Sequence, residues 1–259
     1  MPPSTSSSLP PPECDAVADP AYANLVSRLP PVPCRDDLAR LAESHFHRTG
    51  RAAEIGVYLG YFARNNLAAW TGQYYAIDAW QYRPDDGPDK NYADSELNDQ
   101  NYRSTQRLLK PWSRRVTIIR NLSTAAARRF EDGSLDWVYI DALHTRRALS
   151  ADLHAWWRKL RPGGLLSGDD YGDVRDTPML PFQRWNSTWR AWPKFDWEVV
   201  SVMQRFTRQH CLTLHVTWLH DCYQYPAWYV VKPLRPQQHQ ARSGGHDVAS
   251  AMMRLGAQR

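Results

Sequence analysis

Several polar and acidic residues of the chain stand directly after short apolar runs, at points where a strand would end. They are Glu54 with Gly56 and Gly60, Asp78, Asn121 with Ser123, Asp141 with His144, and Asp169 with Asp170. Carboxylates in such places can bind hydroxyl groups or a hard cation, and a neutral imidazole can accept a proton. A single aspartate after a strand is most often a turn or helix-cap residue, so their joint placement is what indicates a site.

These residues need a scaffold that brings their segments to one place. The pattern predicts strands at 51–57, 73–78, 115–119, 135–141 and 164–168, and helices at 61–70, 123–130 and 148–160. This alternation predicts an α/β fold: a Rossmann-like, doubly wound, mostly parallel sheet with helices on both faces. We expect an antiparallel C-terminal addition built from about 197–203 and 228–232. Ligands of such sheets bind beyond the carboxyl ends of the strands, where the polar residues stand.

The chain of 259 residues is predicted to hold one folded domain, 20–236, between two loose tails. Residues 1–19 are rich in Pro and Ser and predict a disordered tail, and residues 237–259 predict a flexible one. The insertion 81–112 is expected to form a loop and a helix near the mouth of the site. The spacing of four tryptophans favours a face that packs over the sheet, rather than an aromatic wall that holds the acceptor. They are Trp185, Trp189, Trp192 and Trp197.

The composition is that of a soluble globular protein, with 42% hydrophobic and 23% charged residues. No apolar run approaches the roughly 20 residues that cross a bilayer, so we expect no membrane partner. With no secretory signal, the default prediction is a cytoplasmic protein. The net charge of +5 arises from 32 basic residues that are scattered along the chain, so a nucleic-acid partner is not expected. The sequence makes no prediction of oligomeric state.

The turn after the first predicted strand, Glu54-Ile-Gly-Val-Tyr-Leu-Gly60, contains two glycines that let the backbone approach a ligand closely. Its spacing departs from the GxGxxG of dinucleotide enzymes, which makes a nicotinamide oxidoreductase a weak alternative. Asp78 ends the second strand, where a carboxylate can accept both hydroxyls of a ribose. Turn and carboxylate together predict a cofactor that contains a nucleoside.

Longer motifs give the chain a family resemblance. The segment 134–144 reads Ser-Leu-Asp-Trp-Val-Tyr-Ile-Asp-Ala-Leu-His, and 152–171 contains a DLxxW helix followed by a PGG-strand-GxDY ending. With 53–60, 75–78 and a last strand in 227–233, these motifs resemble the class I S-adenosylmethionine-dependent methyltransferases, in the branch with an IDxxH motif. The chain is similar there to the metal-dependent sugar O-methyltransferases.

The resemblance implies S-adenosyl-L-methionine as the cofactor and assigns residues to it. The turn with Glu54, Gly56 and Gly60 would hold the methionine end, and Asp78 the ribose. Asp141 would stand at the catalytic rim beside the cofactor. The adenine would be bordered by Trp80, Asn121 and Ser123.

The resemblance also implies a divalent cation, Mg²⁺, held by Asp141, Asp169 and Asp170, with His144 as general base beside Asp141. Three converging carboxylates repel one another, so independently of any family they either protonate or hold a hard cation. Many relatives of the branch carry Gly-His-Asp-Tyr where this chain has Gly168-Asp-Asp-Tyr171. That departure leaves the metal and the protonated rim as open alternatives.

We therefore predict a methyltransferase that O-methylates a small-molecule acceptor, a sugar or a phenol-like hydroxyl. One alternative is an N- or RNA-methyltransferase of the same fold, for which RNA binding would be tight and salt-dependent. Another is a protein that binds S-adenosylmethionine or a nucleotide without catalysis.

Overall fold

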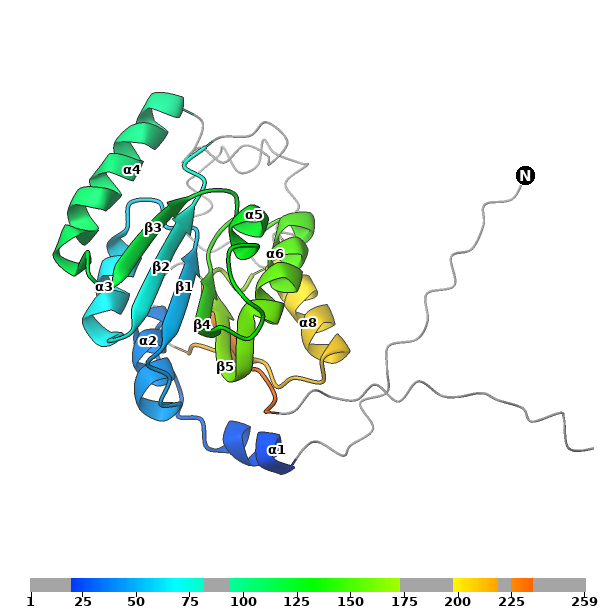
Figure 1. Cartoon of the computed structure of the whole chain (residues 1–259). Coiled ribbons are helices and arrows are strands. Elements are labelled where there is room, and N and C mark those ends of the chain that lie inside the picture. The colour runs from blue at the N-terminus through cyan, green and yellow to red at the C-terminus, as the bar shows by residue number, and fades with distance from the viewer. Residues whose placement is uncertain (1–19, 82–93, 173–197, 219–224, 235–259) are drawn as a thin grey trace, which may run out of the picture.

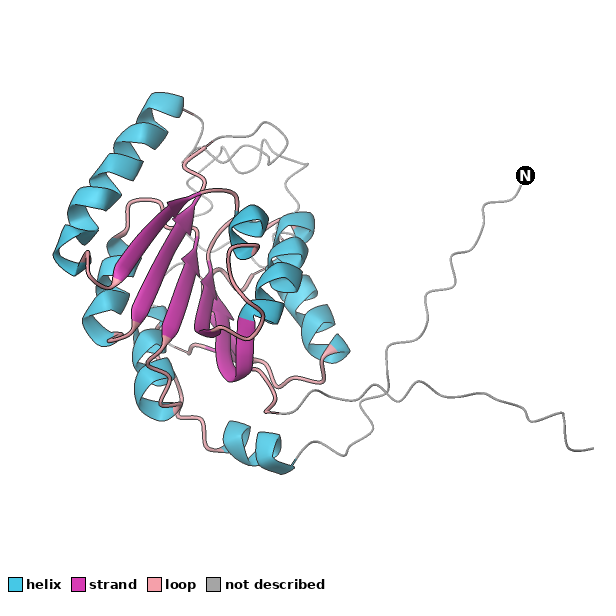
Figure 2. Ribbon diagram, viewed as in Figure 1, coloured by secondary structure: helices cyan, strands magenta, loops and turns pink. Residues whose placement is uncertain are grey.

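The protein is described by a computed structural model that covers residues 20–81, 94–172, 198–218 and 225–234 (Figure 1). The described residues form one sheet with helices on both of its faces (Figure 2). Outside them lie the two predicted tails, part of the insertion 81–112, and Trp185, Trp189, Trp192 and Trp197.

The sheet has the strand order β3-β2-β1-β4-β5-β7-β6. The strands are β1 (Arg51–Ile55), β2 (Gln73–Asp78), β3 (Val116–Arg120), β4 (Leu135–Ile140), β5 (Leu160–Gly168), β6 (His215–Val216) and β7 (Trp228–Val231). The first five are parallel, whereas β7 runs antiparallel to β5 and β6 antiparallel to β7. The strand order reverses between β1 and β4, which is where open α/β sheets bind their ligands.

Helices cover both faces of this sheet (Figure 1). On one face lie α1 (Pro20–Ser27), the 3₁₀ turn η1 (Arg35–Asp37), α2 (Leu38–Arg40), the π-helical η2 (Leu41–His45), α3 (Tyr61–Ala69), α4 (Ser95–Leu109) and the 3₁₀ turn η5 (Lys110–Trp112). On the other lie α5 (Ser123–Ala127), α6 (Arg146–Lys159) and α8 (Val199–Gln209). The predicted doubly wound α/β fold is therefore confirmed.

The core consists of two apolar layers, one on each face of the sheet. Along β4 the side chains alternate, with Trp137 and Tyr139 in the layer under α2 and α3 and Val138 and Ile140 in the layer under α6 and α8. This follows because successive side chains of a strand point to opposite faces. Every residue of β4 is buried, as expected of a parallel strand that is covered on both sides.

Helix α6 begins at Arg146, two residues after His144, and therefore helps to set where that side chain lies. The hydroxyl of Thr145 caps the helix by accepting a hydrogen bond from the backbone nitrogen of Ala148 at 3.3 Å. Leu149 and Trp156, two turns apart on one helix face, are buried against the sheet. The base of the loop after β4 is thereby held in place.

The predicted strand at about 197–203 is wrong, because Val199–Gln209 forms helix α8. Its buried residues Val199, Val202, Met203 and Phe206 recur at the three- and four-residue spacing of a helix face. The antiparallel addition is built from β6 and β7 instead. The strand expected at 228–232 is confirmed by β7.

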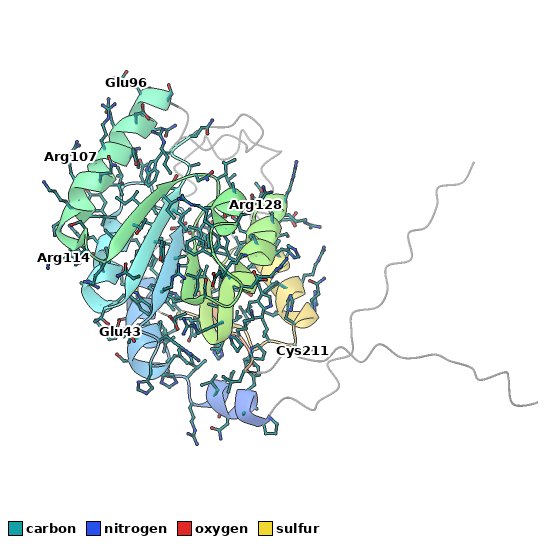
Figure 3. The ribbon with its side chains drawn as sticks, viewed as in Figure 1. Glu43, Glu96, Arg107, Arg114, Arg128 and Cys211 are labelled. Carbon is teal, nitrogen blue, oxygen red and sulfur yellow. The ribbon has the colours of Figure 1, made fainter. Side chains whose placement is uncertain are left out.

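Three basic side chains labelled in Figure 3 stand at separate places on the described surface. Arg107 lies on α4, Arg114 follows η5 and Arg128 follows α5, and all three are exposed. Within the described part of the chain, no helix has the length and apolar character needed to cross a membrane.

Candidate functional site

The ends of β1, β4 and β5 lie at one level of the sheet. Ile55 pairs with Ile140, and Ile140 with Gly168. The residues that follow these three positions, Gly56, Asp141 and Asp169, therefore emerge side by side. The sheet brings the predicted cofactor turn and the predicted acidic residues to one edge, at the point where the strand order reverses.

Gly56 allows the chain to turn sharply at this edge. Its φ is +90°, and a β-carbon there would lie 1.7 Å from the carbonyl oxygen of Asp141. The backbone nitrogen of Asp141 in turn donates to the carbonyl oxygen of Ile55 at 2.7 Å. Only glycine fits a position with this dihedral and this close approach of two backbones.

Asp78 is buried directly beneath the turn. Its Oδ2 accepts hydrogen bonds from the backbone nitrogens of Val57 and Tyr58, both at 2.8 Å, and its Oδ1 accepts one from the nitrogen of Trp80 at 2.7 Å. The carboxylate predicted to bind the ribose thus holds the turn in shape. Each carboxylate oxygen can accept more than one hydrogen bond, so these contacts leave capacity for a ligand hydroxyl.

Glu54 is almost fully enclosed at the end of β1. The Tyr74 hydroxyl donates a hydrogen bond to its Oε2, and Nδ2 of Asn66 donates to the Tyr74 oxygen at 2.9 Å. Burial raises the pKa of Glu54 to about 8, and the hydrogen bond from Tyr74 opposes this rise. The carboxyl group therefore supports the turn from below, as part of a buried polar chain.

Trp80 supports the same turn from the side. Its side chain is fully buried, and its indole Nε1 donates to the carbonyl oxygen of Tyr58 at 2.8 Å. The indole packs against Tyr102 of α4 with ring centroids 4.9 Å apart. Gly60, which ends the turn at the start of α3, has a φ of +78°, in the left-handed region that favours glycine. The predicted adenine contact of Trp80 stays a prediction.

Asn121 and Ser123 follow β3 and are engaged with the protein itself. Oδ1 of Asn121 accepts from the backbone nitrogen of Leu122 at 2.8 Å. The Ser123 hydroxyl donates to Asp152 and accepts from Nε1 of Trp156 at 2.9 Å. Ser123 thereby ties α5 to α6, and its predicted contact with adenine is untested.

His144 lies between two of the predicted acidic residues. Its Nε2 is 3.7 Å from Oδ1 of Asp141, and its Nδ1 is 3.5 Å from Oδ2 of Asp170. The backbone below is held by Glu198, whose nitrogen donates to the His144 carbonyl oxygen at 3.1 Å. Burial lowers the pKa of His144 to about 4, so the imidazole is neutral at pH 7.

Arg35, from the turn η1 before the first strand, reaches into this group of side chains. Its guanidinium donates a hydrogen bond to Oδ2 of Asp169 and lies 3.6 Å from Oδ2 of Asp141. It also stacks over the ring of Phe62 at 4.9 Å from the centroid. A cation of the protein is thus in contact with two of the three carboxylates that were predicted to hold Mg²⁺.

The carboxylates of this rim influence one another strongly. Burial is the largest cause that raises the pKa of Asp141 well above its usual range, and the charges of Asp169 and Asp170 raise it further. Burial also raises the pKa of Asp169 and of Asp170, whereas Arg35 lowers all three. The guanidinium is therefore what favours the charged forms.

Comparison with known proteins supplies a family for this geometry. A family of methyltransferase domains matches residues 53–171, the stretch that holds the glycine turn, Asp78, the rim and His144. Residues 53–171 are a methyltransferase domain, and its sheet has the class I methyltransferase fold. No curated protein matches the methyltransferase in sequence.

Solved structures share the fold of this methyltransferase at low sequence identity. A Corynebacterium glutamicum protein is 17% identical with a TM-score of 0.51, over 86% of this chain and 92% of its own. A caffeoyl-CoA O-methyltransferase candidate from Staphylococcus aureus is 14% identical with a TM-score of 0.52, over 82% and 90%. Phosphoethanolamine N-methyltransferase 2 from Haemonchus contortus, in complex with S-adenosyl-L-methionine, is 16% identical with a TM-score of 0.51, over 82% and 56%.

Sequence reasoning missed three residues of the site. Arg35 precedes the first strand in a segment without regular apolar spacing, and 134 positions separate it from Asp169. Tyr74 and Tyr139 sit inside strands, where an aromatic residue indicates packing rather than a polar contact. Burial, and then the charges of Asp169 and Asp141, raise the pKa of Tyr139 well above its usual range, so its phenol belongs to the surroundings of the rim.

Proposed function

We propose that this methyltransferase transfers a methyl group to the hydroxyl oxygen of a small polar acceptor, a sugar or a phenol-like compound. The observation that carries the proposal is the placement of a neutral imidazole, His144, between Asp141 and Asp170 at the ligand edge of the sheet. A hydroxyl is a poor nucleophile until it loses its proton, so a base beside the cofactor site favours oxygen as the methylated atom.

The cofactor would lie along the carboxyl ends of β1, β2 and β3. S-adenosylmethionine supplies an electrophilic methyl group on a sulfonium centre. In the proposed arrangement the turn with Glu54, Gly56 and Gly60 takes the methionine end and Asp78 the ribose, while Trp80, Asn121 and Ser123 border the adenine. The close backbone approach at Gly56 and the amide contacts of Asp78 support this assignment, because both fix the backbone of the turn at the ligand edge of the sheet.

His144 would accept the acceptor's proton as the oxygen attacks. A bond forms between that oxygen and the methyl carbon, the carbon–sulfur bond breaks, and its electron pair returns to sulfur. A base with a pKa of about 4 is weak alone. The imidazolium that forms lies within 4 Å of Asp141 and Asp170, and the charged forms of these carboxylates, which Arg35 favours, would stabilise it during the transfer.

The family resemblance implies a magnesium ion held by Asp141, Asp169 and Asp170. The donor set does not fit the ion as these side chains stand, because the Arg35 guanidinium already binds Oδ2 of Asp169 and faces Asp141. Among the residues described, no group of three His, Cys, Asp or Glu side chains has an arrangement suited to a metal. The proposed reaction therefore proceeds through His144 and the positioned substrates.

The test is an acceptor screen with the purified chain, S-adenosylmethionine and a panel of sugars, phenols, amines and RNA. Release of S-adenosylhomocysteine is measured and the methylated atom is located by NMR. We expect a methylated hydroxyl and, with that acceptor, a kcat about 10²–10⁴-fold lower for His144→Ala. His154→Ala, an exposed histidine on α6, is the matched control and should keep its activity. Methylation of an amine or RNA alone, or full activity of His144→Ala, would overturn the proposal.

A further inference from the structure

We propose that Arg35 is the built-in cation of the acidic rim: its guanidinium takes the position that a divalent ion would occupy, and replacing it opens a metal site. The inference rests on the proposed function, because that function makes this rim part of the catalytic site. It goes further, because it predicts that the chain binds no divalent ion there and that one arginine is the reason.

The electrostatic need for such a cation follows from the rim itself. Asp169 is buried, Asp141 and Asp170 are partly buried, and the charge of Asp169 disfavours the charged forms of the other two. Carboxylates placed so close together either take up protons or pair with positive charge. Arg35 supplies that charge at Asp169 and at Asp141.

The position of Arg35 is firmly set by its neighbours in the chain. The side chain of Cys34 before it and those of Leu38 and Ala39 after it are buried, the last two completely. The Phe62 ring lies beneath the guanidinium, which is the geometry of a cation–π contact. Arg35 thus belongs to an anchored turn, and its contact with the rim is part of the folded structure.

The same contacts explain why the guanidinium and an ion exclude each other. Mg²⁺ binds carboxylate oxygens at about 2.0–2.1 Å and needs several oxygen ligands around it. Oδ2 of Asp169 accepts a hydrogen bond from Arg35, and Oδ2 of Asp141 faces the same guanidinium nitrogen at 3.6 Å. A divalent ion between these oxygens would overlap the planar guanidinium of Arg35 and would be repelled by its positive charge.

The experiment compares wild type with Arg35→Met, which keeps the length of the side chain and removes its charge. The control is Arg40→Met in the neighbouring helix, since Arg40 is mostly exposed and pairs with Asp37. Binding of Mn²⁺ is measured by electron paramagnetic resonance, and thermal unfolding is followed in EDTA and in Mn²⁺. Neither readout requires an acceptor, so a failed acceptor screen and a failed metal test are distinguishable.

We expect wild type and Arg40→Met to bind no Mn²⁺ at the rim and to unfold at the same temperature in EDTA and in Mn²⁺. Arg35→Met should unfold at a lower temperature in EDTA, recover in Mn²⁺, and bind the ion at least about tenfold more tightly than wild type. Arg35→Met combined with Asp169→Asn should lose that binding, and Arg35→Lys should not gain it. Stoichiometric Mn²⁺ binding by wild type that Asp169→Asn abolishes would overturn the inference, even if Arg35→Met fails to fold. Affinity of folded Arg35→Met equal to wild type would overturn it as well.

Discussion

The carbonyl oxygen of Asp141 occupies the space in which Gly56 would carry a side chain. A β-carbon on Gly56 would stand 1.7 Å from that oxygen. The contact joins the ends of β1 and β4 where the strand order of the sheet reverses. The glycine turn of the proposed cofactor site and the rim that carries His144 are therefore two sides of one backbone junction.

Gly56→Ala should disrupt this junction severely. The added methyl group overlaps backbone, which cannot move without displacing β4, and the φ of +90° is unfavourable for alanine. We expect a loss of more than about 4 kcal/mol in the free energy of unfolding, measured in urea. Gly133→Ala is the matched control, because Gly133 also has a positive φ, +70°, but has open space around its β-carbon position. It should cost about 1–2 kcal/mol. Equal costs for the two variants would contradict the account.

Glu54→Gln should make stability less dependent on pH. The folded state raises the pKa of Glu54 from 4.5 to about 8, so the native protein holds this proton where the unfolded chain has lost it. Its contribution is therefore most favourable below pH 4.5, declines as the pH rises, and levels off above about pH 8. The glutamine variant lacks this decline and can still accept the hydrogen bond from Tyr74.

Urea unfolding of both proteins at pH 5 and pH 8.5 tests this. Between pH 5 and pH 8.5, the free energy of unfolding of the variant should rise relative to that of wild type by up to a few kcal/mol. Glu131→Gln, at an exposed position, should follow wild type throughout. A stability difference between Glu54→Gln and wild type that does not change with pH would show that Glu54 keeps its charge when folded.

Ser123→Ala should affect stability more than cofactor affinity. Its hydroxyl joins Asp152 to the indole of Trp156, and burial raises the pKa of Asp152 to about 6. Removing the hydroxyl leaves two buried polar groups with one partner fewer, which costs about 1–3 kcal/mol. Thermal unfolding and S-adenosylhomocysteine titration separate the two effects, with the exposed Thr124→Ala as control. A large loss of affinity at unchanged stability would mean that the hydroxyl binds the cofactor directly.

The sequence predicted the central strands well because their signal is local. Residues 73–78 are a strand as expected, and 135–140 are apolar except for Asp136 because both faces of β4 are covered. Helix α8 was mistaken for a strand because Val199, Val200 and Val202 are β-branched. The helical spacing of its buried residues, which extends to Phe206, was the more informative pattern.

The polar edge of the sheet was predictable, whereas its charge balance was not. Asp141, His144 and Asp170 lie within one predicted edge, so the topology alone brings them together. The approach of Arg35 depends on how the segment before β1 packs across that edge, and no short-range pattern encodes such a contact. For the same reason the sequence left a bound cation and a protonated rim as alternatives, where the structure has a guanidinium.

The most direct test of the account is calorimetric titration of S-adenosylhomocysteine into wild type and Asp78→Asn. Asp78 links the turn to the proposed ribose position, so its replacement should weaken micromolar binding by at least about tenfold. Asp132→Asn, which removes a surface carboxylate paired with Arg158 and Lys159, should bind like wild type. Absence of binding by the folded wild-type protein, or equal affinity of Asp78→Asn, would contradict the assignment of the cofactor site.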